Sequence, residues 1–296
     1  MDKVMIASPL AYVGGKRFMI KYIVPIIEAY EHTTYVEPFG GAAHILLAKK
    51  PSKVEVYNDI NDIVVNFFKV LADKELSQEL VRQVSILPYS RKLFKESTVA
   101  MYKEQDPVKR AVAFFIVSKQ SFAGNVFGNS PSWSFSVLHK KTTLTWERCP
   151  RALAGVHARL RMVQIDCLDF RRIFKNYDRP TTLFYCDPPY VLSTRYEEYY
   201  RHEMSDDDHK ELVDILLRIS GAAIVSGYRH EIYDRLVANG WMSVDIPVTC
   251  FARHTRDSSK RPTRTEVLWI HPRIAEAVDV NRILAQATGK KKRAER

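Results

Sequence analysis

The sequence has few cysteines, and their spacing indicates neither a metal site nor a set of disulfides. Its 296 residues include four cysteines, without the CxxC or histidine-paired spacing of zinc sites. We therefore expect no metal and no disulfide, and we expect Cys167 and Cys186 to be buried thiols beside strands. This cysteine usage fits a reducing cytoplasm.

Long apolar segments are absent as well. No apolar run approaches the roughly 20 residues that cross a membrane, and the N-terminus, MDKVMIASPL, lacks the apolar region of a signal peptide. With 46% hydrophobic and 27% charged residues, the composition is that of a globular protein. We expect a cytoplasmic protein with no membrane partner.

The excess of positive charge is concentrated in two segments. The net charge is +11, and residues 66–158 contain 14 Lys and Arg against 7 Asp and Glu. Residues 289–296 contain 5 against 1, while the rest of the chain is balanced. A basic middle segment on a neutral body predicts a polyanionic partner. For the tail, the simpler interpretation is a disordered, solubilising end.

Apolar strands alternate with helical patterns in two separate blocks, 1–65 and 159–275. This alternation predicts one doubly wound, Rossmann-like α/β core built from both blocks. Between them, residues 66–158 read as a mainly helical insert, with a loop or irregular hairpin at 121–138 that is rich in Gly, Ser, Asn and aromatic residues. Residues 276–296 read as a basic, flexible tail.

The stretch TLFYCDPPY, residues 182–190, reads as a buried strand that stops at an acidic residue and two prolines. In open α/β sheets, ligands bind at the carboxyl ends of the strands. Asp187 and the carbonyl of Pro188 are suited to polarise an exocyclic aromatic amine, while Tyr190 stacks on its ring. Because a base inside a duplex cannot enter such a pocket, it must be flipped out.

A second set of residues suggests a nucleoside-containing cofactor. The Gly14–Gly15 turn precedes a helical pattern and allows a ligand to approach the backbone. Asp59 ends the second strand, where a carboxylate can bind ribose hydroxyls. The alternative is a tight turn with a helix-capping Asp59. GxGxxG and GxxxxGKS/T are missing, which disfavours dinucleotide and P-loop sites of the usual kind.

Taken in order, YVGGK, VEPFGG, YNDIN, the Asp169–Phe170 pair and DPPY resemble the motifs of the Dam-type DNA adenine methyltransferases, between about residues 10 and 271. The resemblance implies a site-specific enzyme of the restriction–modification kind, S-adenosylmethionine as cofactor, and transfer to the exocyclic amine of adenine in double-stranded DNA. It implies that the catalytic residues are Asp187, Pro188, Pro189 and Tyr190. It implies that the cofactor-binding residues are Tyr12, Gly14, Gly15, Lys16, Glu37, Phe39, Gly40, Gly41, Asp59, Asp169, Phe170 and Asp187.

Two features depart from this pattern or leave it open. The first motif reads FGGAAH where many members have FxGxG, so the cofactor loop can differ in detail. Asp166 competes with Asp169 for the acidic position near the cofactor's adenine, and we favour Asp169 because Phe170 follows it.

The insert is expected to read DNA, and a monomer suffices for this chemistry. Basic side chains, Arg110 among them, are expected to meet phosphates. Phe127 or Trp133 would wedge into the space left by a flipped base, or would instead form the small core of the loop. The expected DNA-binding residues are Arg91, Lys92, Lys119, Asn125, Phe127, Asn129 and Trp133.

Three alternatives remain open from the sequence. The first is the same chemistry on the exocyclic amine of cytosine, although many such enzymes carry Ser at the position of Asp187. The second is methylation of adenine in RNA. The third is a DNA-binding relative whose methyltransferase core is inactive, which the intact DPPY and the Gly-Gly turn disfavour.

Overall fold

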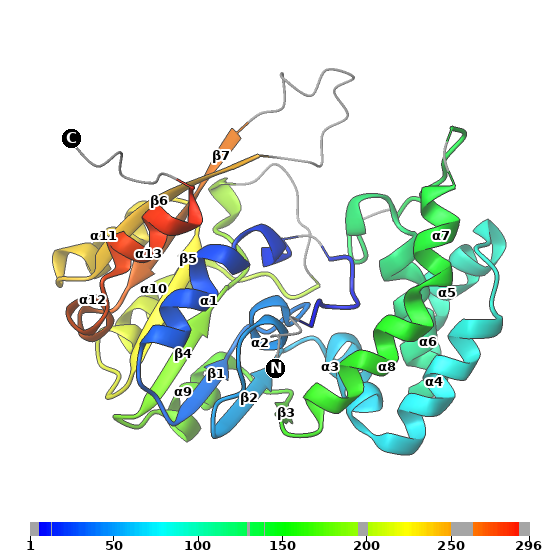
Figure 1. Ribbon diagram of the computed structural model, residues 1–296, viewed down its shortest axis with the longest axis horizontal. Coiled ribbons are helices and arrows are strands. Elements are labelled where there is room, and N and C mark those ends of the chain that lie inside the picture. The colour runs from blue at the N-terminus through cyan, green and yellow to red at the C-terminus, as the bar shows by residue number, and fades with distance from the viewer. Residues whose placement is uncertain are drawn as a thin grey trace.

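A computed structural model describes residues 6–12, 14–128, 131–138, 140–194, 201–249 and 263–289. The molecule has a sheet with helices on both faces and, to one side of it, a helical lobe (Figure 1). We use "helical lobe" for residues 74–160. No helix in the described ranges is long and apolar enough to span a membrane.

Seven strands form one sheet in the order β3-β2-β1-β4-β5-β7-β6. The first five strands in chain order run parallel, and β7 runs antiparallel to both β5 and β6. This confirms the expected doubly wound sheet and its final strand pair. The strands are β1 Thr34–Glu37, β2 Val54–Asn58, β3 Gln164–Asp166, β4 Thr182–Cys186, β5 Ala222–Gly227, β6 Met242–Thr249 and β7 Thr263–Ile270.

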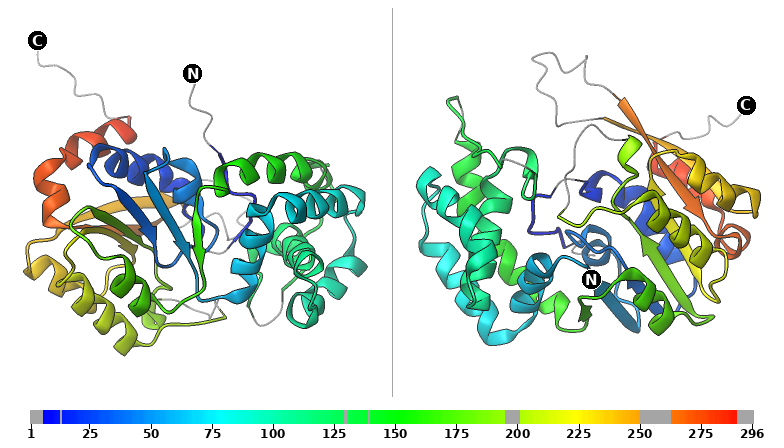
Figure 2. Two further views of the ribbon diagram at one scale, coloured as in Figure 1. Left: turned by 90° about the horizontal axis from the view of Figure 1, so that it is seen from below. Right: turned by 180° about the vertical axis from the view of Figure 1, so that it is seen from behind.

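Alternate residues of each buried strand point to opposite faces of the sheet, so each face has its own apolar cluster. Tyr35 belongs to one cluster and its neighbour Val36 to the other. The first face is covered by α1 Ile20–Ala29, α2 His44–Ala48, α12 Pro272–Ala277 and α13 Val280–Ala287. The second is covered by α9 Phe170–Tyr177, α10 Asp206–Leu216 and α11 Glu231–Ala238 (Figure 2).

The helical lobe packs on the sheet through α3 Asp62–Ala72, and one apolar cluster continues through both. Phe67 of α3 stacks on Phe115 of α6 (Pro107–Gln120), with ring centroids 5.7 Å apart. The expected boundary between residues 65 and 66 falls inside α3. The lobe's helices are α4 Lys74–Ile86, α5 Arg91–Lys103, α6 Pro107–Gln120, α7 Lys141–Glu147 and α8 Cys149–Leu160.

The segment between α6 and α7 begins as a short hairpin. Ser121 forms an isolated antiparallel bridge with Trp133, and backbone hydrogen bonds join Phe122 to Ser132 and Ser134 to Gln120. The 3-10 turn Phe122–Gly124 follows α6 directly; the other 3-10 turns are Lys16–Phe18 and Leu192–Thr194. The expected irregular hairpin is therefore confirmed.

Two sequence predictions were wrong. The tail was expected to be flexible from residue 276, but it is helical up to Ala287, because Val280 is buried and the Asp279 side chain caps α13. The residues beyond 289 lie outside the described ranges. Cys186 is buried as expected, but Cys167 is exposed, since it follows the short edge strand β3, which pairs with β2 alone in the described sheet.

A buried group of charges joins α8 to the sheet. Glu55 of β2 is 1% exposed, and its carboxylate accepts hydrogen bonds from Lys49 Nζ at 2.5 Å and Arg159 Nη2 at 2.8 Å. A second, shorter contact runs from Arg159 Nη1 to the other oxygen of Glu55. Lys49 also lies 4.2 Å from the ring centroid of Tyr35. One carboxylate thus stands between two buried cations.

Candidate active site

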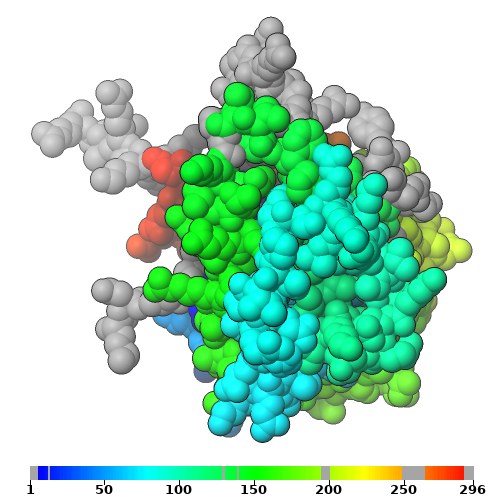
Figure 3. Space-filling model, turned by 90° about the vertical axis from the view of Figure 1, so that its right-hand side faces the viewer, coloured from blue at the N-terminus to red at the C-terminus, as the bar shows by residue number. Residues whose placement is uncertain are grey.

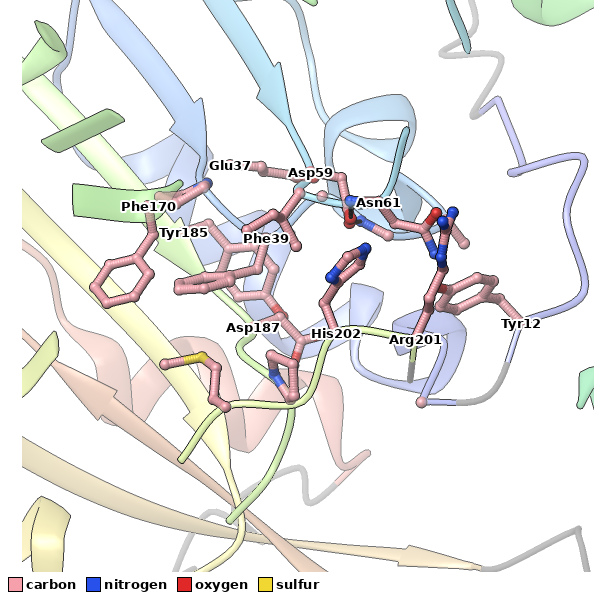
Figure 4. A pocket seen from close by; sticks show the side chains of 18 of the residues that line it. Tyr12, Glu37, Phe39, Asp59, Asn61, Phe170, Tyr185, Asp187, Arg201 and His202 are labelled. Carbon is pink, nitrogen blue, oxygen red and sulfur yellow. Dashed lines mark hydrogen bonds between the residues drawn. The ribbon is translucent and has the colours of Figure 1, made fainter. Parts of the chain in front are cut away.

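The sequence-predicted cofactor residues surround a single cavity of about 260 Å³. It opens at the carboxyl ends of β1, β2 and β4, beside β1, where the strand order reverses (Figure 4). This is the position at which doubly wound sheets bind their ligands. All twelve line it: Tyr12, Gly14, Gly15, Lys16, Glu37, Phe39, Gly40, Gly41, Asp59, Asp169, Phe170 and Asp187.

Two glycines after β1 bring the backbone to the cavity wall. A Cβ on Gly40 would overlap the ring of Tyr57, whose hydroxyl donates to the carbonyl of Gly41 at 2.7 Å. Gly41 has a φ of +46°, a left-handed conformation that costs a glycine little. The tight turn therefore requires glycine for two separate reasons.

Ala43 occupies the position at which FGGAAH departs from the FxGxG pattern. Its φ is +54°, so it holds a left-handed conformation at the N-terminus of α2. This conformation is uncommon for any residue with a Cβ. The backbone therefore keeps the glycine-type geometry although the side chain has changed.

Two carboxyl groups lie at the floor of the cavity. Asp59 accepts hydrogen bonds from the backbone N–H of Gly41 and of Asn61, both at 2.8 Å. Glu37 is 2% exposed and accepts a hydrogen bond from the hydroxyl of Tyr35 at 2.7 Å. Burial raises the pKa of Asp59, and it raises the pKa of Glu37 to about 8. Glu37 is therefore mostly protonated at neutral pH.

An aromatic wall forms on the β3 side of the cavity. The ring centroids of Phe39 and Phe170 are 5.4 Å apart, and the guanidinium of Arg171 lies 4.4 Å from the ring centroid of Phe170. Asp169 caps α9 through the backbone N–H of Arg171 at 2.9 Å. Asp166, the alternative acid, accepts a hydrogen bond from Tyr177 and does not line the cavity. This placement favours Asp169 over Asp166.

Asp187, directly after β4, is held by two neighbours, and a third side chain contacts one of them. Its Oδ1 accepts hydrogen bonds from Lys16 Nζ at 2.8 Å and from Ser226 Oγ at 3.0 Å, and the hydroxyl of Tyr185 lies 2.9 Å from Ser226 Oγ. Burial raises the pKa of Asp187, while Lys16 opposes the rise. The result is a carboxylate with a fixed orientation at the rim of the cavity.

Of the remaining DPPY residues, Pro189 lines the cavity, whereas Pro188 and Tyr190 lie beside it. The Tyr190 hydroxyl donates to Glu266 of β7, and Tyr228 meets the ring edge-on at 4.4 Å between centroids. Lys16 Nζ lies 4.7 Å from the centroid of the Tyr190 ring. Lys16 therefore occupies the space between the carboxylate and the aromatic ring.

The expected DNA-binding residues lie on or under the helical lobe, whose outer face is shown in Figure 3. Arg91 lies over the ring of Trp133 at 4.9 Å, and Lys92 is paired with Glu96. Phe127 packs against Phe114 and Tyr12. Lys119 is half-buried on α6, the Asn125 side chain accepts from the backbone of Gly128, and Asn129 lies outside the described residues.

The sequence reasoning missed the segment Arg201–Met204, whose four residues line the cavity. It also missed Ser226 and Glu266, which contact Asp187 and Tyr190. One signal was present: the segment lies between the end of β4 and the Ser205-capped start of α10, so it must cross the ligand side of the sheet. No cluster of metal-binding side chains occurs among the described residues.

Comparison with known proteins agrees with this geometry. Residues 12–244 match the family described as D12 class N6 adenine-specific DNA methyltransferase. One curated relative, the type II methyltransferase M.FokI of Planomicrobium okeanokoites, is 28% identical over 204 residues, which cover 64% of this chain and 30% of the relative. The chain thus matches less than a third of that relative's length. Because the family match includes every strand end around the cavity, the chain belongs to the D12 class of N6 adenine-specific DNA methyltransferases.

Proposed function

We propose that this protein transfers a methyl group from S-adenosylmethionine to the exocyclic amine of an adenine at a specific site in double-stranded DNA. The observation that carries the proposal is the orientation of Asp187, held beside the ring of Tyr190 at the rim of the cavity. A carboxylate and a ring at one point suit a planar base that bears an amine.

The residues of the cavity fit S-adenosylmethionine. Asp59 can accept the ribose hydroxyls, because its backbone hydrogen bonds leave lone pairs free on both oxygens. Phe39 and Phe170 offer apolar faces to an adenine ring, and Glu37 offers a carboxyl group to the cationic end. S-adenosylmethionine, when bound, supplies a methyl group activated on a sulfonium. Lys16, whose Nζ pairs with Asp187 and donates to the carbonyl of Gly14 in the free protein, lies at the cavity where it could instead contact the carboxylate of the cofactor.

The target amine would be activated by position and by hydrogen bonding. Asp187 and the carbonyl of Pro188 accept its two N–H groups, which shifts the nitrogen toward tetrahedral geometry and raises its nucleophilicity. The base then takes the place between Asp187 and Tyr190 that the ammonium of Lys16 fills in the free protein. No covalent intermediate with the protein is required.

We propose that the two blocks 1–65 and 159–275 form the catalytic core and that the basic segment 66–158 binds the duplex. Arg91, stacked on Trp133, is a suitable phosphate contact at the N-terminus of α5. Phe135 is 62% exposed and stacks on Trp133. It is therefore a better candidate for a wedge than Phe127, which is packed against α6. We further propose that one copy of the chain suffices.

The test is transfer of labelled methyl groups to DNA of mixed sequence, followed by nucleoside analysis and sequencing of the modified positions. We expect the label to appear only in adenine, within one recognised sequence, and more of it in double-stranded DNA than in RNA. Asp187→Asn should abolish transfer and retain cofactor binding. Asp214→Asn, on the outer surface of α10, is the matched control. Label in cytosine or RNA, or DNA binding without cofactor binding, would replace the proposal with one of the alternatives.

A further inference from the structure

The segment Arg201–Met204, called the closing segment below, forms the outer wall of the cavity. Its four residues line the cavity opposite the strand ends, and Figure 4 shows Arg201 and His202 reaching across toward Asn61 and Asp59. His202 opposes the rise in the pKa of Asp59, in keeping with that position. A ligand that fills the cavity would therefore lie beneath the closing segment.

The two ends of the closing segment are held differently. Met204 is 7% exposed and belongs to the apolar cluster under α10, whose first turn is fixed by the capping box of Ser205 and Asp208. Arg201, at the other end, is held by a charge. Its Nη1 donates to Asp62 Oδ1 at 2.6 Å, and the two side chains are 36% and 50% exposed. The Arg201 end is thus the one that can open at low cost.

Asp62 connects this contact to the helical lobe. Its other oxygen accepts a hydrogen bond from Arg110 Nη2 of α6 at 2.5 Å, and Arg110 Nε donates to the carbonyl of Met101 of α5. Arg201 also lies over the ring of Tyr102 of α5, 5.5 Å from its centroid. One carboxylate, at the first position of α3, therefore holds the closing segment and the helical lobe together.

We propose that Arg201 is a positioning residue that holds the closing segment over the cofactor cavity, and that Asp62 couples this closure to the helical lobe through Arg110. The inference rests on the proposed function, because it requires the cavity to bind S-adenosylmethionine. Release of the cofactor then requires the Arg201–Asp62 contact to break. A movement of the helical lobe when DNA binds would strengthen or weaken the Arg201–Asp62 contact, and would thereby change the rate at which the cofactor is released.

The test is the dissociation rate of tritiated S-adenosylmethionine from the full-length protein, chased with unlabelled cofactor in the absence of DNA. A half-exposed ion pair of this kind predicts that Arg201→Ala accelerates release by about two- to fivefold. Asp62→Asn should accelerate release at least as much, and the double variant no more than Asp62→Asn alone. Arg201→Lys should restore part of the slow release, because it keeps the charge.

Arg235→Ala is the matched control, because Arg235 pairs with Asp214 at 2.7 Å with similar exposure and neither residue lines the cavity. Its dissociation rate should equal that of the wild type. Raising salt from about 0.05 to 0.5 M should speed release from the wild type and not from Arg201→Ala, since salt screens the pair.

If the wild type binds no S-adenosylmethionine, the proposed function itself fails. If it binds, and Arg201→Ala releases the cofactor at the wild-type rate, the positioning role is refuted and the proposed function stands. Equal acceleration by Arg201→Ala in the wild-type and Asp62→Asn backgrounds would also overturn the coupling. Unchanged thermal unfolding of each variant shows that the effect is local.

Discussion

Among the buried charges that join α8 to the sheet, Glu55 should be the one whose replacement by an uncharged residue costs most stability. The substitution that tests this is Glu55→Gln. In the wild type, Glu55 is the anion shared by Lys49 and Arg159, which are 3% and 8% exposed. Glu37, the next carboxyl group, is mostly protonated at neutral pH because its pKa is about 8. Glutamine keeps the shape of the side chain but leaves two buried cations with no anion between them.

The magnitude follows from the number of charges that remain unpaired. Removal of one partner from a buried ion pair costs about 3–5 kcal/mol, and Glu55→Gln does this to two cations at once. Arg159→Met leaves Lys49 and Glu55 as a neutral pair and loses the hydrogen bond to the carbonyl of Leu46, so its cost should be about 1–2 kcal/mol. The expected order is therefore Glu55→Gln well above Arg159→Met.

Urea denaturation followed by circular dichroism measures both free energies of unfolding. Glu79→Gln is the matched control, because Glu79 pairs with Arg82 on the exposed face of α4, and its midpoint should not move. In Glu55→Gln, the pKa of Glu37 should also fall, since Lys49, whose charge already lowers that pKa, would no longer be neutralised by Glu55. A loss below about 1 kcal/mol for Glu55→Gln, or a larger loss for Arg159→Met, would refute this reasoning.

Three further predictions concern the cavity. Gly40→Ala should abolish cofactor binding in calorimetry, because the new Cβ overlaps the ring of Tyr57. The control is Gly155→Ala in α8, where the Cβ has open space and should raise the free energy of unfolding by about 0.5–1 kcal/mol. A stable Gly40→Ala variant that binds the cofactor would contradict the first expectation. Glu37 has a folded pKa of about 8 against 4.5 when unfolded, so its contribution to stability is complete below pH 4.5 and is lost as pH rises toward 8; urea titrations at several pH values should show Glu37→Gln lacking this loss of about 1.4 kcal/mol per pH unit. Ser226→Ala removes one hydrogen bond to Asp187 and should lower kcat about tenfold with KM for the cofactor unchanged; a rise in KM alone would assign Ser226 to binding.

The sequence was most informative where the physical cause is local. A strand that stops at Asp187, a glycine turn at Gly40 and a carboxylate at Asp59 are each determined by a few neighbouring residues. Because the carboxyl ends of parallel strands lie at one edge, those local signals were sufficient to assemble the cavity. The same reasoning correctly separated the strands of the sheet from the helices of the insert.

The contacts that escaped sequence reasoning join residues far apart in the chain. Arg201 and Asp62 are separated by 139 positions, and neither lies in a motif that names its partner. Arg110 was expected to meet phosphate, yet its guanidinium is turned to Asp62 because α6 packs beside α3. Phe135 carries no sequence signal that separates it from Phe127. Phe127 is covered because it packs against Phe114 of α6, whereas Phe135 stays exposed, and the sequence alone does not show which of the two rings α6 covers.

The shared α3 has a consequence for anyone who wishes to change the recognised site by exchanging segments between relatives. A graft of residues 66–158 would cut α3 and would separate Phe68 from Tyr57 of β2, whose ring centroids lie 4.7 Å apart, so the packing of α3 on the sheet would be disrupted. Exchanging only the hairpin between α6 and α7 would disturb the apolar core less. It is anchored at Gln120 and Ser134 by main-chain hydrogen bonds, which any donor sequence can supply. On the proposed function, specificity should therefore be easier to change by replacing this hairpin than by exchanging the whole insert.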